Sequence, residues 1–295
     1  MPRPLEAVPN FSEGRSEETV AAIRHTLARH AHVLDVHADP DHNRSVFTIA
    51  GSELGLVDAL LAGIACARDR IDLRHHEGVH PRVGAADVVP VVAVWPEQLE
   101  EARRAALTLA DRVADDLGLP VFLYGDVAPG VRPAAIRRGG LPELQRRIDA
   151  GELAPDRGPA RLDSRAGGVL VGARRPLVAF NVDLATADVG VAESIAATVR
   201  ETGGGFPGVR ALGFPLPSRG LVQVSMNIED WELSPLDEIV ARVHAEAAAR
   251  GVGVVGSELV GLMPEGAARP GAAALGLAAL DESQLLEPQL SRLAS

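Results

Sequence analysis

The apolar segments of this chain follow one order twice, and this repeat limits the fold more than any other feature. A strand, a helix, two strands, a helix and a strand are predicted in that order within residues 5–95. The same order is predicted again within residues 175–263. Two β-α-β-β-α-β units predict an α+β fold of two ferredoxin-like subdomains side by side, with a ligand cleft between them.

The repeat places a domain boundary near Arg175, in the turn between two predicted strands. We therefore expect one subdomain at residues 1–175 and a second at residues 176–295. In the first, helices are predicted at 16–30 and 52–70, and a longer helix (96–118) and a strand (119–125) follow the repeated unit. The last segment, about 30 residues, is too short for another domain.

Charge and composition exclude several classes of protein. The net charge of −11 argues against nonspecific nucleic-acid binding, which needs an extended basic surface. All 29 basic residues are arginine, which excludes Schiff-base catalysis, a Walker lysine and a Ser–Lys dyad. No apolar run could span a membrane, the N-terminus has no secretory core, and the single Cys66 cannot form an internal disulfide. We expect a cytoplasmic protein that binds neither nucleic acid nor membrane.

One glycine pattern imitates a nucleotide site. Residues 251–256 (GVGVVG) match G-x-G-x-x-G, but a helix is predicted before them and a strand after them. A dinucleotide site needs the opposite order, so the pattern indicates a helix end at Gly251 and a tight entry to the strand.

A histidine-rich segment, residues 74–90 (RHHEGVHPRVGAADVVP), leads into the last strand of the first unit. Pro81 restricts His80 to an extended conformation, and Gly84 allows a tight backbone turn. A histidine held in this way, with Arg82 two residues later, indicates a general acid–base group beside an anion-binding guanidinium. A loop whose histidines are only solvated explains the same residues equally well.

A metal site is another interpretation of the histidines. Between two predicted strands, ligands are offered by His37, Asp39, Asp41 and His42, together with His75, His76 or His80 of the histidine-rich segment. Nitrogen and oxygen ligands of this kind suit zinc or manganese. Such residues more often cap and solvate a turn-rich loop, and we expect no metal.

A basic segment lies ahead of the proposed boundary. Residues 159–176 (PARLDSRAGGVLVGARRP) contain several arginines, Arg165 and Arg174 among them, against one acid, Asp163. Gly167 and Gly168 precede a predicted strand and would let a flat ligand approach the backbone closely. A solvated arginine-rich turn is the alternative.

Several segments resemble the glutamate formimidoyltransferase family, and the resemblance spans nearly the whole chain. The VPNFSEG opening and the HPR-x-GA-x-D segment are together highly specific. The segments that carry the resemblance are VPNFSEGR (8–15), NRSVFTIAG (43–51), GVHPRVGAADVVP (78–90), VFLYGD (121–126), LVGARRPLVAFNVDL (170–184), LVQVSMNI (221–228) and VVGSELVGLMP (254–264).

The resemblance implies transfer of a formimidoyl group from N-formimidoyl-L-glutamate to tetrahydrofolate, a co-substrate, with release of glutamate. It implies two α/β subdomains that bind reduced folate in the groove between them, in agreement with the duplicated units. It implies that His80 matches the catalytic histidine of the family. It also implies that residues 165–174 match the folate-binding segment, with Gly167, Gly172, Ala173 and Arg174 in register.

The implied reaction moves one proton off the attacking N5 of tetrahydrofolate and one onto the leaving nitrogen. A histidine titrating near neutrality, His80, can do both in turn. Both substrates carry carboxylates, so we nominate Arg44, Arg82 and Arg174 to hold them. Asn10 and Asn43 either orient polar groups or stabilise turns. The full set of predicted substrate- and folate-binding residues is Asn10, His37, Asn43, Arg44, Arg82, Gly84, Tyr124, Gly125, Arg165, Gly167, Gly168, Gly172, Ala173 and Arg174.

The sequence departs from the animal enzymes of this family at two positions. They carry an aspartate where this chain has His37, and an aromatic residue where it has Ala166. A carboxylate would stabilise the cationic formimidoyl group, whereas a formyl group prefers donors such as histidine. Formyl transfer between N-formylglutamate and folate is therefore an alternative. A non-catalytic folate-binding protein and a metal-dependent hydrolase are two others.

The resemblance covers the transferase part of the family alone. Larger members continue into a helical cyclodeaminase domain, whereas 31 residues follow Pro264 in this chain of 295. We expect transferase activity without the second reaction. The expected partners are the two small-molecule substrates and a second copy of the chain in a homodimer.

Overall fold

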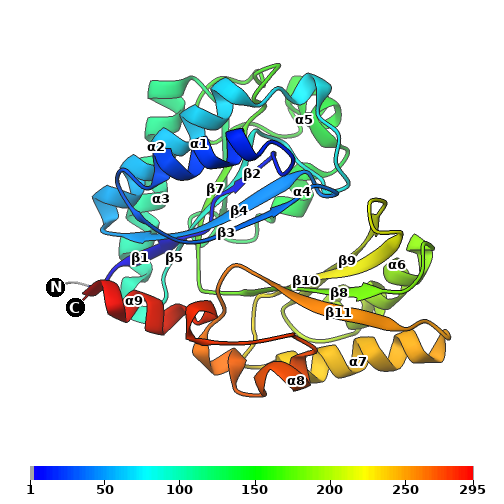
Figure 1. Cartoon of the computed structure of the whole chain (residues 1–295). Helices are drawn as coiled ribbons and strands as arrows, with labels where there is room; N and C mark the ends of the chain where they lie inside the picture. Colours follow the sequence, from blue (N-terminus) through cyan, green and yellow to red (C-terminus); the bar gives the residue numbers. More distant parts are fainter. Residues whose placement is uncertain (1–2, 295) are drawn as a thin grey trace. The chain divides into compact units, whose positions relative to one another are not determined.

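The computed structural model describes residues 3–294, and these form two compact units. The first unit runs to Arg175, and the second begins at Pro176. Each combines helices with a β-sheet (Figure 1), so the α+β class predicted from the sequence is confirmed.

The sheet of the first unit has the strand order β3-β4-β2-β5-β7-β6, and β1 also lies between β4 and β5. Strands β5, β7 and β6 are parallel to one another, and the other pairs are antiparallel. The strands are β1 (Leu5–Ala7), β2 (Asn10–Phe11), β3 (His32–Asp39), β4 (Arg44–Gly51), β5 (Ala86–Val92), β6 (Val121–Gly125) and β7 (Val169–Arg174).

Helices cover both faces of this sheet, but unequally. One face packs on α1 (Glu17–Leu27), α2 (Glu53–Arg70) and α3 (Leu99–Leu117), as Figure 1 shows. The opposite face is covered beside β6 and β7 by α4 (Pro133–Arg137) and α5 (Gly140–Asp149), whose buried side chains meet Phe122 and Leu170. Two short 3₁₀ turns, η1 (Leu73–His75) and η2 (Pro96–Gln98), connect these elements.

Local sequence explains where the helices begin and end. The side-chain oxygens of Ser16 and Ser52 accept hydrogen bonds from the backbone N–H groups of Thr19 and Gly55, both at 3.2 Å, which caps α1 and α2. Helix α3 ends at Gly118, whose φ of +65° is costly for other residues. The strands are buried on the face toward the helices because apolar residues alternate along them.

In the first unit, the ends of two elements differ from those predicted, and two short helices were not predicted. Helix α1 ends at Leu27, three residues before the predicted end, because residues 28–30 form a turn. Strand β3 extends to Asp39, two residues past the strand predicted at residues 32–37. No element was predicted at α4 and α5, since α4 is one short turn and α5 begins with glycine and proline, which are weak helix signals.

The second unit is an antiparallel sheet in the order β11-β8-β10-β9, packed on α6 and α7. Alternate residues of β8, such as Phe180 and Val182, face the core, while Asn181 and Asp183 face away from it. Its elements are β8 (Val178–Leu184), α6 (Val189–Val199), η3 (Glu201–Gly203), β9 (Val209–Leu216), β10 (Leu221–Ile228), α7 (Leu236–Ala249) and β11 (Val254–Val260).

The glycine pattern at residues 251–256 leads from a helix into a strand. Helix α7 precedes it, β11 begins within it at Val254, and Gly251 has the left-handed φ of +68°. The remaining segment adds Leu275 to the core of the second unit. It contains η4 (Glu265–Ala268), α8 (Gly271–Leu275), η5 (Glu282–Gln284) and α9 (Leu286–Ala294). None of the helices within residues 3–294 combines the length and apolar character that crossing a membrane requires.

Candidate functional site

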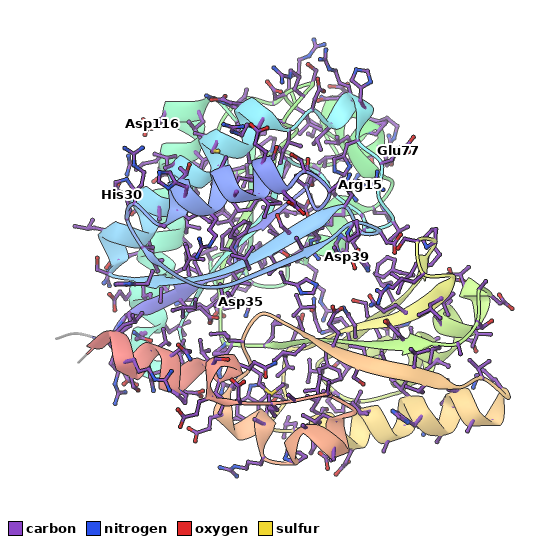
Figure 2. All side chains as sticks on the ribbon, viewed as in Figure 1. Arg15, His30, Asp35, Asp39, Glu77 and Asp116 are labelled. Atoms are coloured by element: carbon purple, nitrogen blue, oxygen red, sulfur yellow. The ribbon has the colours of Figure 1, made fainter. Side chains whose placement is uncertain are left out.

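Polar side chains share the face of the first sheet that lies opposite α1–α3. Directly paired residues on adjacent strands point to the same face. The pair Val36–Phe47 belongs to the helix-covered core, so the neighbouring pairs His37–Val46 and Asp39–Arg44 lie on the other face. Figure 2 labels Asp39 near one end of β3 and Asp35 farther along it. Asn10 is paired with Val46 and joins the same row.

His80 is held through both ring nitrogens. Its Nδ1 lies 2.7 Å from the carbonyl oxygen of Pro81, and its Nε2 lies 3.1 Å from Nη1 of Arg44. A neutral imidazole with its proton on Nδ1 satisfies both contacts, because Nδ1 donates to the carbonyl and Nε2 accepts from Arg44. The basic lone pair of His80 is therefore directed toward the Arg44 side of the ring.

Burial and positive neighbours keep His80 neutral. Burial lowers the pKa of His80 well below the ordinary value of 6.5, and the charges of Arg44, Arg137 and His42 lower it further. Burial is also the main cause that lowers the pKa of Arg44, to about 9. At neutral pH the imidazole is thus in the form that accepts a proton.

Arg82 joins two loops through backbone carbonyls. Its Nε and Nη2 donate to the carbonyl of His80 at 3.1 and 2.8 Å, and Nη2 also donates to the carbonyl of His42 at 3.0 Å. Its Nη1 donates to the carbonyl of Asn43 at 3.2 Å and lies 2.6 Å from Nδ1 of His76. The guanidinium is therefore used to fix the His80 loop against the β3–β4 turn.

Asn43 supplies a second link between the same loops. It has a left-handed φ of +46°, a conformation that asparagine tolerates better than most residues. Its Oδ1 accepts from the backbone N–H of Gly14 at 2.9 Å, and its Nδ2 donates to the carbonyl of Glu77 at 2.8 Å. Because Arg44 follows directly in the chain, these bonds also fix the start of β4.

The predicted glycines allow two backbone segments to approach closely. Gly84 pairs with Gly167 in an antiparallel bridge, and the N–H of Gly168 donates to the carbonyl of Val83 at 2.9 Å. A Cβ on Gly84 or Gly167 would collide with backbone carbonyls. These glycines bring the start of β7 beside the segment that follows His80.

On β6 and β7, Gly172 makes room for the ring of Tyr124. A Cβ on Gly172 would lie 2.6 Å from Cε1 of that ring. Burial raises the pKa of Tyr124 to about 12, although Arg174 nearby opposes the rise. Gly125 ends β6 with a φ of +66°, where a Cβ would collide with the carbonyl of Ala173.

Other predicted residues are engaged elsewhere. Arg165 is exposed and forms an ion pair with Asp72 at 3.4 Å. The Nδ2 of Asn10 donates to the carbonyl of Val8 at 2.7 Å, and Nη1 of Arg174 donates to the carbonyl of Arg175 at 2.9 Å. Within residues 3–294, no three His, Cys, Asp or Glu side chains converge as a metal site would require.

Comparisons with known proteins agree with this arrangement. The model of the formiminotransferase domain, N-terminal subdomain, matches residues 4–174, and the model of the formiminotransferase domain matches residues 179–280. The chain belongs to the formiminotransferase family. The resemblance stated from the sequence motifs is thereby confirmed.

Named formiminotransferases resemble this chain over most of its length. A glutamate formimidoyltransferase of Thermoplasma acidophilum is 41% identical over 272 residues, which cover 89% of each chain. One from Streptococcus pyogenes serotype M1 is 37% identical, with 90% of each chain covered. The formimidoyltransferase-cyclodeaminase of Sus scrofa is also 37% identical, but the match covers 50% of that longer protein.

Two charged residues beside the candidate site were not singled out from the sequence. Asp87, at the start of β5, is 2% exposed and forms an ion pair with Arg137 of α4. Asp87 is the last residue of the motif HPR-x-GA-x-D, and its place in that motif could have indicated a role in the site. Arg137 belongs to a helix that the sequence did not predict and had no comparable signal.

Proposed function

We propose that this protein transfers a formimidoyl group from N-formimidoyl-L-glutamate to tetrahydrofolate and releases glutamate. Tetrahydrofolate is a co-substrate in this reaction, and the reaction needs no metal. The observation that carries the proposal is the neutral His80, fixed between Pro81 and Arg44, in a member of the formiminotransferase family. The names of the relatives support formimidoyl transfer in preference to formyl transfer or binding without catalysis.

The proposed mechanism uses His80 twice. Nε2 of His80 has one acceptor lone pair, so Arg44 must first leave it for a substrate carboxylate. As N5 of tetrahydrofolate attacks the formimidoyl carbon, Nε2 of His80 then accepts the proton that leaves N5. The resulting imidazolium then donates a proton to the glutamate nitrogen, which leaves as the tetrahedral intermediate collapses. Such proton transfer contributes about 10²–10⁴-fold in rate. Holding both substrates in one site supplies much of the remainder.

The proposed binding residues divide into two roles. Arg44 and Arg174 have the geometry of carboxylate-binding groups, since a guanidinium can donate two parallel hydrogen bonds. Arg82 and Asn43 act by positioning, because their polar atoms already bind backbone groups of the two loops. We assign the folate-binding role to residues 165–174 on the basis of the family motif. Gly167 shapes this segment by packing against the backbone of Val83 and Gly84.

We further propose that both units have the ferredoxin-like arrangement. In the second unit, the order β11-β8-β10-β9 supports this, because it is the fourth-first-third-second order of that arrangement. In the first unit, β1 and β2 together take the place of the first strand, while β7 and β6 extend the sheet beyond β5.

The proposed partners are the two substrates and a second copy of the chain, in the cytoplasm. The free, partly buried Cys66 is compatible with a reducing compartment. Sedimentation equilibrium tests the homodimer, for which we expect twice the mass of one chain. A mass of one chain at micromolar concentration would contradict it.

The assay that tests the function supplies tetrahydrofolate and N-formimidoyl-glutamate and follows 5-formimidoyl-tetrahydrofolate. We expect His80→Ala to lower kcat by about 10²-fold or more and to leave the Kd for tetrahydrofolate nearly unchanged. The matched control is His75→Ala, an exposed histidine five residues earlier, which should keep full activity. A His80→Ala protein within a few-fold of the wild-type kcat would remove His80 from the mechanism.

A further inference from the structure

The ion pair between Asp87 and Arg137 connects two elements that are distant in sequence. Asp87 is the second residue of β5, and Arg137 ends α4, 50 residues later. Besides the ion pair, Oδ1 of Asp87 accepts a hydrogen bond from the N–H of Val83 at 2.8 Å. One carboxylate therefore holds both the helix and the segment that follows His80.

The pair is buried, and stability does not explain it. The side chain of Asp87 is 2% exposed and that of Arg137 is 13% exposed. The Nε of Arg137 is buried and has no hydrogen-bond partner among the described residues. Because burying charges and leaving a donor unpaired both cost free energy, apolar residues would suit this position at least as well if only stability mattered.

The charges of this pair act on the proposed catalytic group. Arg137 is among the groups that lower the pKa of His80 and of Arg44, and Asp87 opposes the effect on Arg44. Charged and titratable groups around His80 come from several elements: Arg44 on β4, His42 in the β3–β4 turn, Arg82 in the loop after His80, and Arg137 on α4. Asp87 on β5 is paired with Arg137. Asp87 is the acidic member of this group.

We propose that Asp87 and Arg137 are positioning residues that set the charge around His80 and fix the loop that carries it. This inference rests on the proposed role of His80. Asp87 holds the loop through Val83, and Arg137 contributes positive charge that favours the neutral imidazole. Asp87 in turn offsets part of that charge. His80 can therefore still hold a proton during turnover.

Two substitutions separate charge from structure. Arg137→Met removes the positive charge while keeping an apolar stem of similar length. Asp87→Asn removes the negative charge but leaves an oxygen that can accept from Val83. We expect Arg137→Met to raise the pKa of His80, and Asp87→Asn to lower it, each by about half a pH unit or more. Arg137→Lys keeps the charge and should restore most of the wild-type value.

The primary measurement is the pKa of His80 by NMR titration of histidine-labelled protein without substrate, with the resonance assigned by its loss in His80→Gln. Arg138→Met, the exposed neighbour of Arg137, is the matched control and should leave the titration unchanged. The acid limb of kcat/KM should move in the same direction as the NMR pKa in each variant.

Opposite shifts in the two variants would support the proposal. A purely structural role predicts a shift in one direction, since loosening the loop would expose His80 and raise its pKa toward 6.5 in both variants. That result, or an unchanged pKa in both, would overturn it. Because the titration needs no turnover, a protein that shows the shifts but does not transfer the formimidoyl group would contradict the proposed function alone.

Discussion

His80 is kept neutral in the folded protein, and this has a consequence for stability. In the unfolded chain the imidazole takes up a proton below about pH 6.5. In the folded protein it does not, because burial and Arg44 lower its pKa. Below that pH the unfolded state binds the additional proton, so the free energy of unfolding falls as the pH falls and rises as the pH rises.

We therefore expect His80→Gln to weaken the pH dependence of stability. Between pH 7 and pH 5 the difference in slope between wild type and variant should approach, at most, about 1.4 kcal/mol per pH unit. Urea unfolding at several pH values measures it, and His25→Gln, an exposed position on α1, is the control. Parallel pH profiles for wild type and His80→Gln would show that His80 titrates similarly in both states.

At the same scale, Arg174 belongs to the proposed folate-binding segment. Its guanidinium lies close enough to Tyr124 to act on the pKa of that side chain. We expect Arg174→Ala to weaken tetrahydrofolate binding by about 1.5–3 kcal/mol, the range for hydrogen bonds to a charged group. Arg161→Ala, an exposed arginine of the same basic segment, should bind folate normally. Isothermal titration calorimetry gives both constants, and equal affinities for the two variants would move the folate site elsewhere.

At the scale of elements, β7 depends on one glycine. Gly172 lies against the ring of buried Tyr124, so an added methyl group must displace the ring or the strand. We expect Gly172→Ala to destabilise the protein by about 1–3 kcal/mol, as overpacking does. Gly256→Ala in β11 is the matched control, because a Cβ there meets no atom within 4 Å.

The denaturant midpoint of each glycine variant, at unchanged m-value, checks this prediction. Gly256→Ala should be neutral or slightly stabilising, since alanine restricts the unfolded chain more than glycine does. If Gly172→Ala were as stable as Gly256→Ala, then β7 and Tyr124 would have room that the geometry does not indicate.

At the scale of the whole molecule, each unit has a core of its own and carries one of the two tryptophans. Trp95 belongs to the first unit and Trp231 packs against the core of the second. Phe47 and Phe180 are fully buried in the first and second cores. A fluorescence signal can thus be assigned to one unit when the other tryptophan is replaced by phenylalanine.

We expect Phe180→Ala to lower the stability reported by Trp231 by about 3–5 kcal/mol, the usual cost of deleting a buried ring. Phe47→Ala should act in the same way on the transition reported by Trp95. In each variant the tryptophan of the altered unit should respond more strongly than the other. Identical shifts at both tryptophans would show that the units unfold as one.

Much of the architecture could be predicted from the sequence. Alternation in strands such as β8 and helical periodicity in α2 and α7 are local patterns, and the duplicated order of these segments led to the α+β class. The motif around His80 led to the family, because proline and glycine restrict the backbone in ways that can be recognised along the chain. Helices α4 and α5 were not predicted, because short segments that begin with proline or glycine show little periodicity of apolar residues.

The contacts that set the chemistry were decided by the tertiary structure alone. Arg44 contacts His80, 36 residues away in the sequence, and Arg137 contacts Asp87, 50 residues away. Strand register and the path of the chain bring these residues together. The residue type also leaves the role of an arginine open. Arg82 donates to backbone carbonyls, while Arg165 forms an ion pair with the partly buried carboxylate of Asp72. The sequence by itself determined which groups this protein has for acid–base chemistry, and folding determined which of them meet, because burial and neighbouring charge exist only once distant segments pack together.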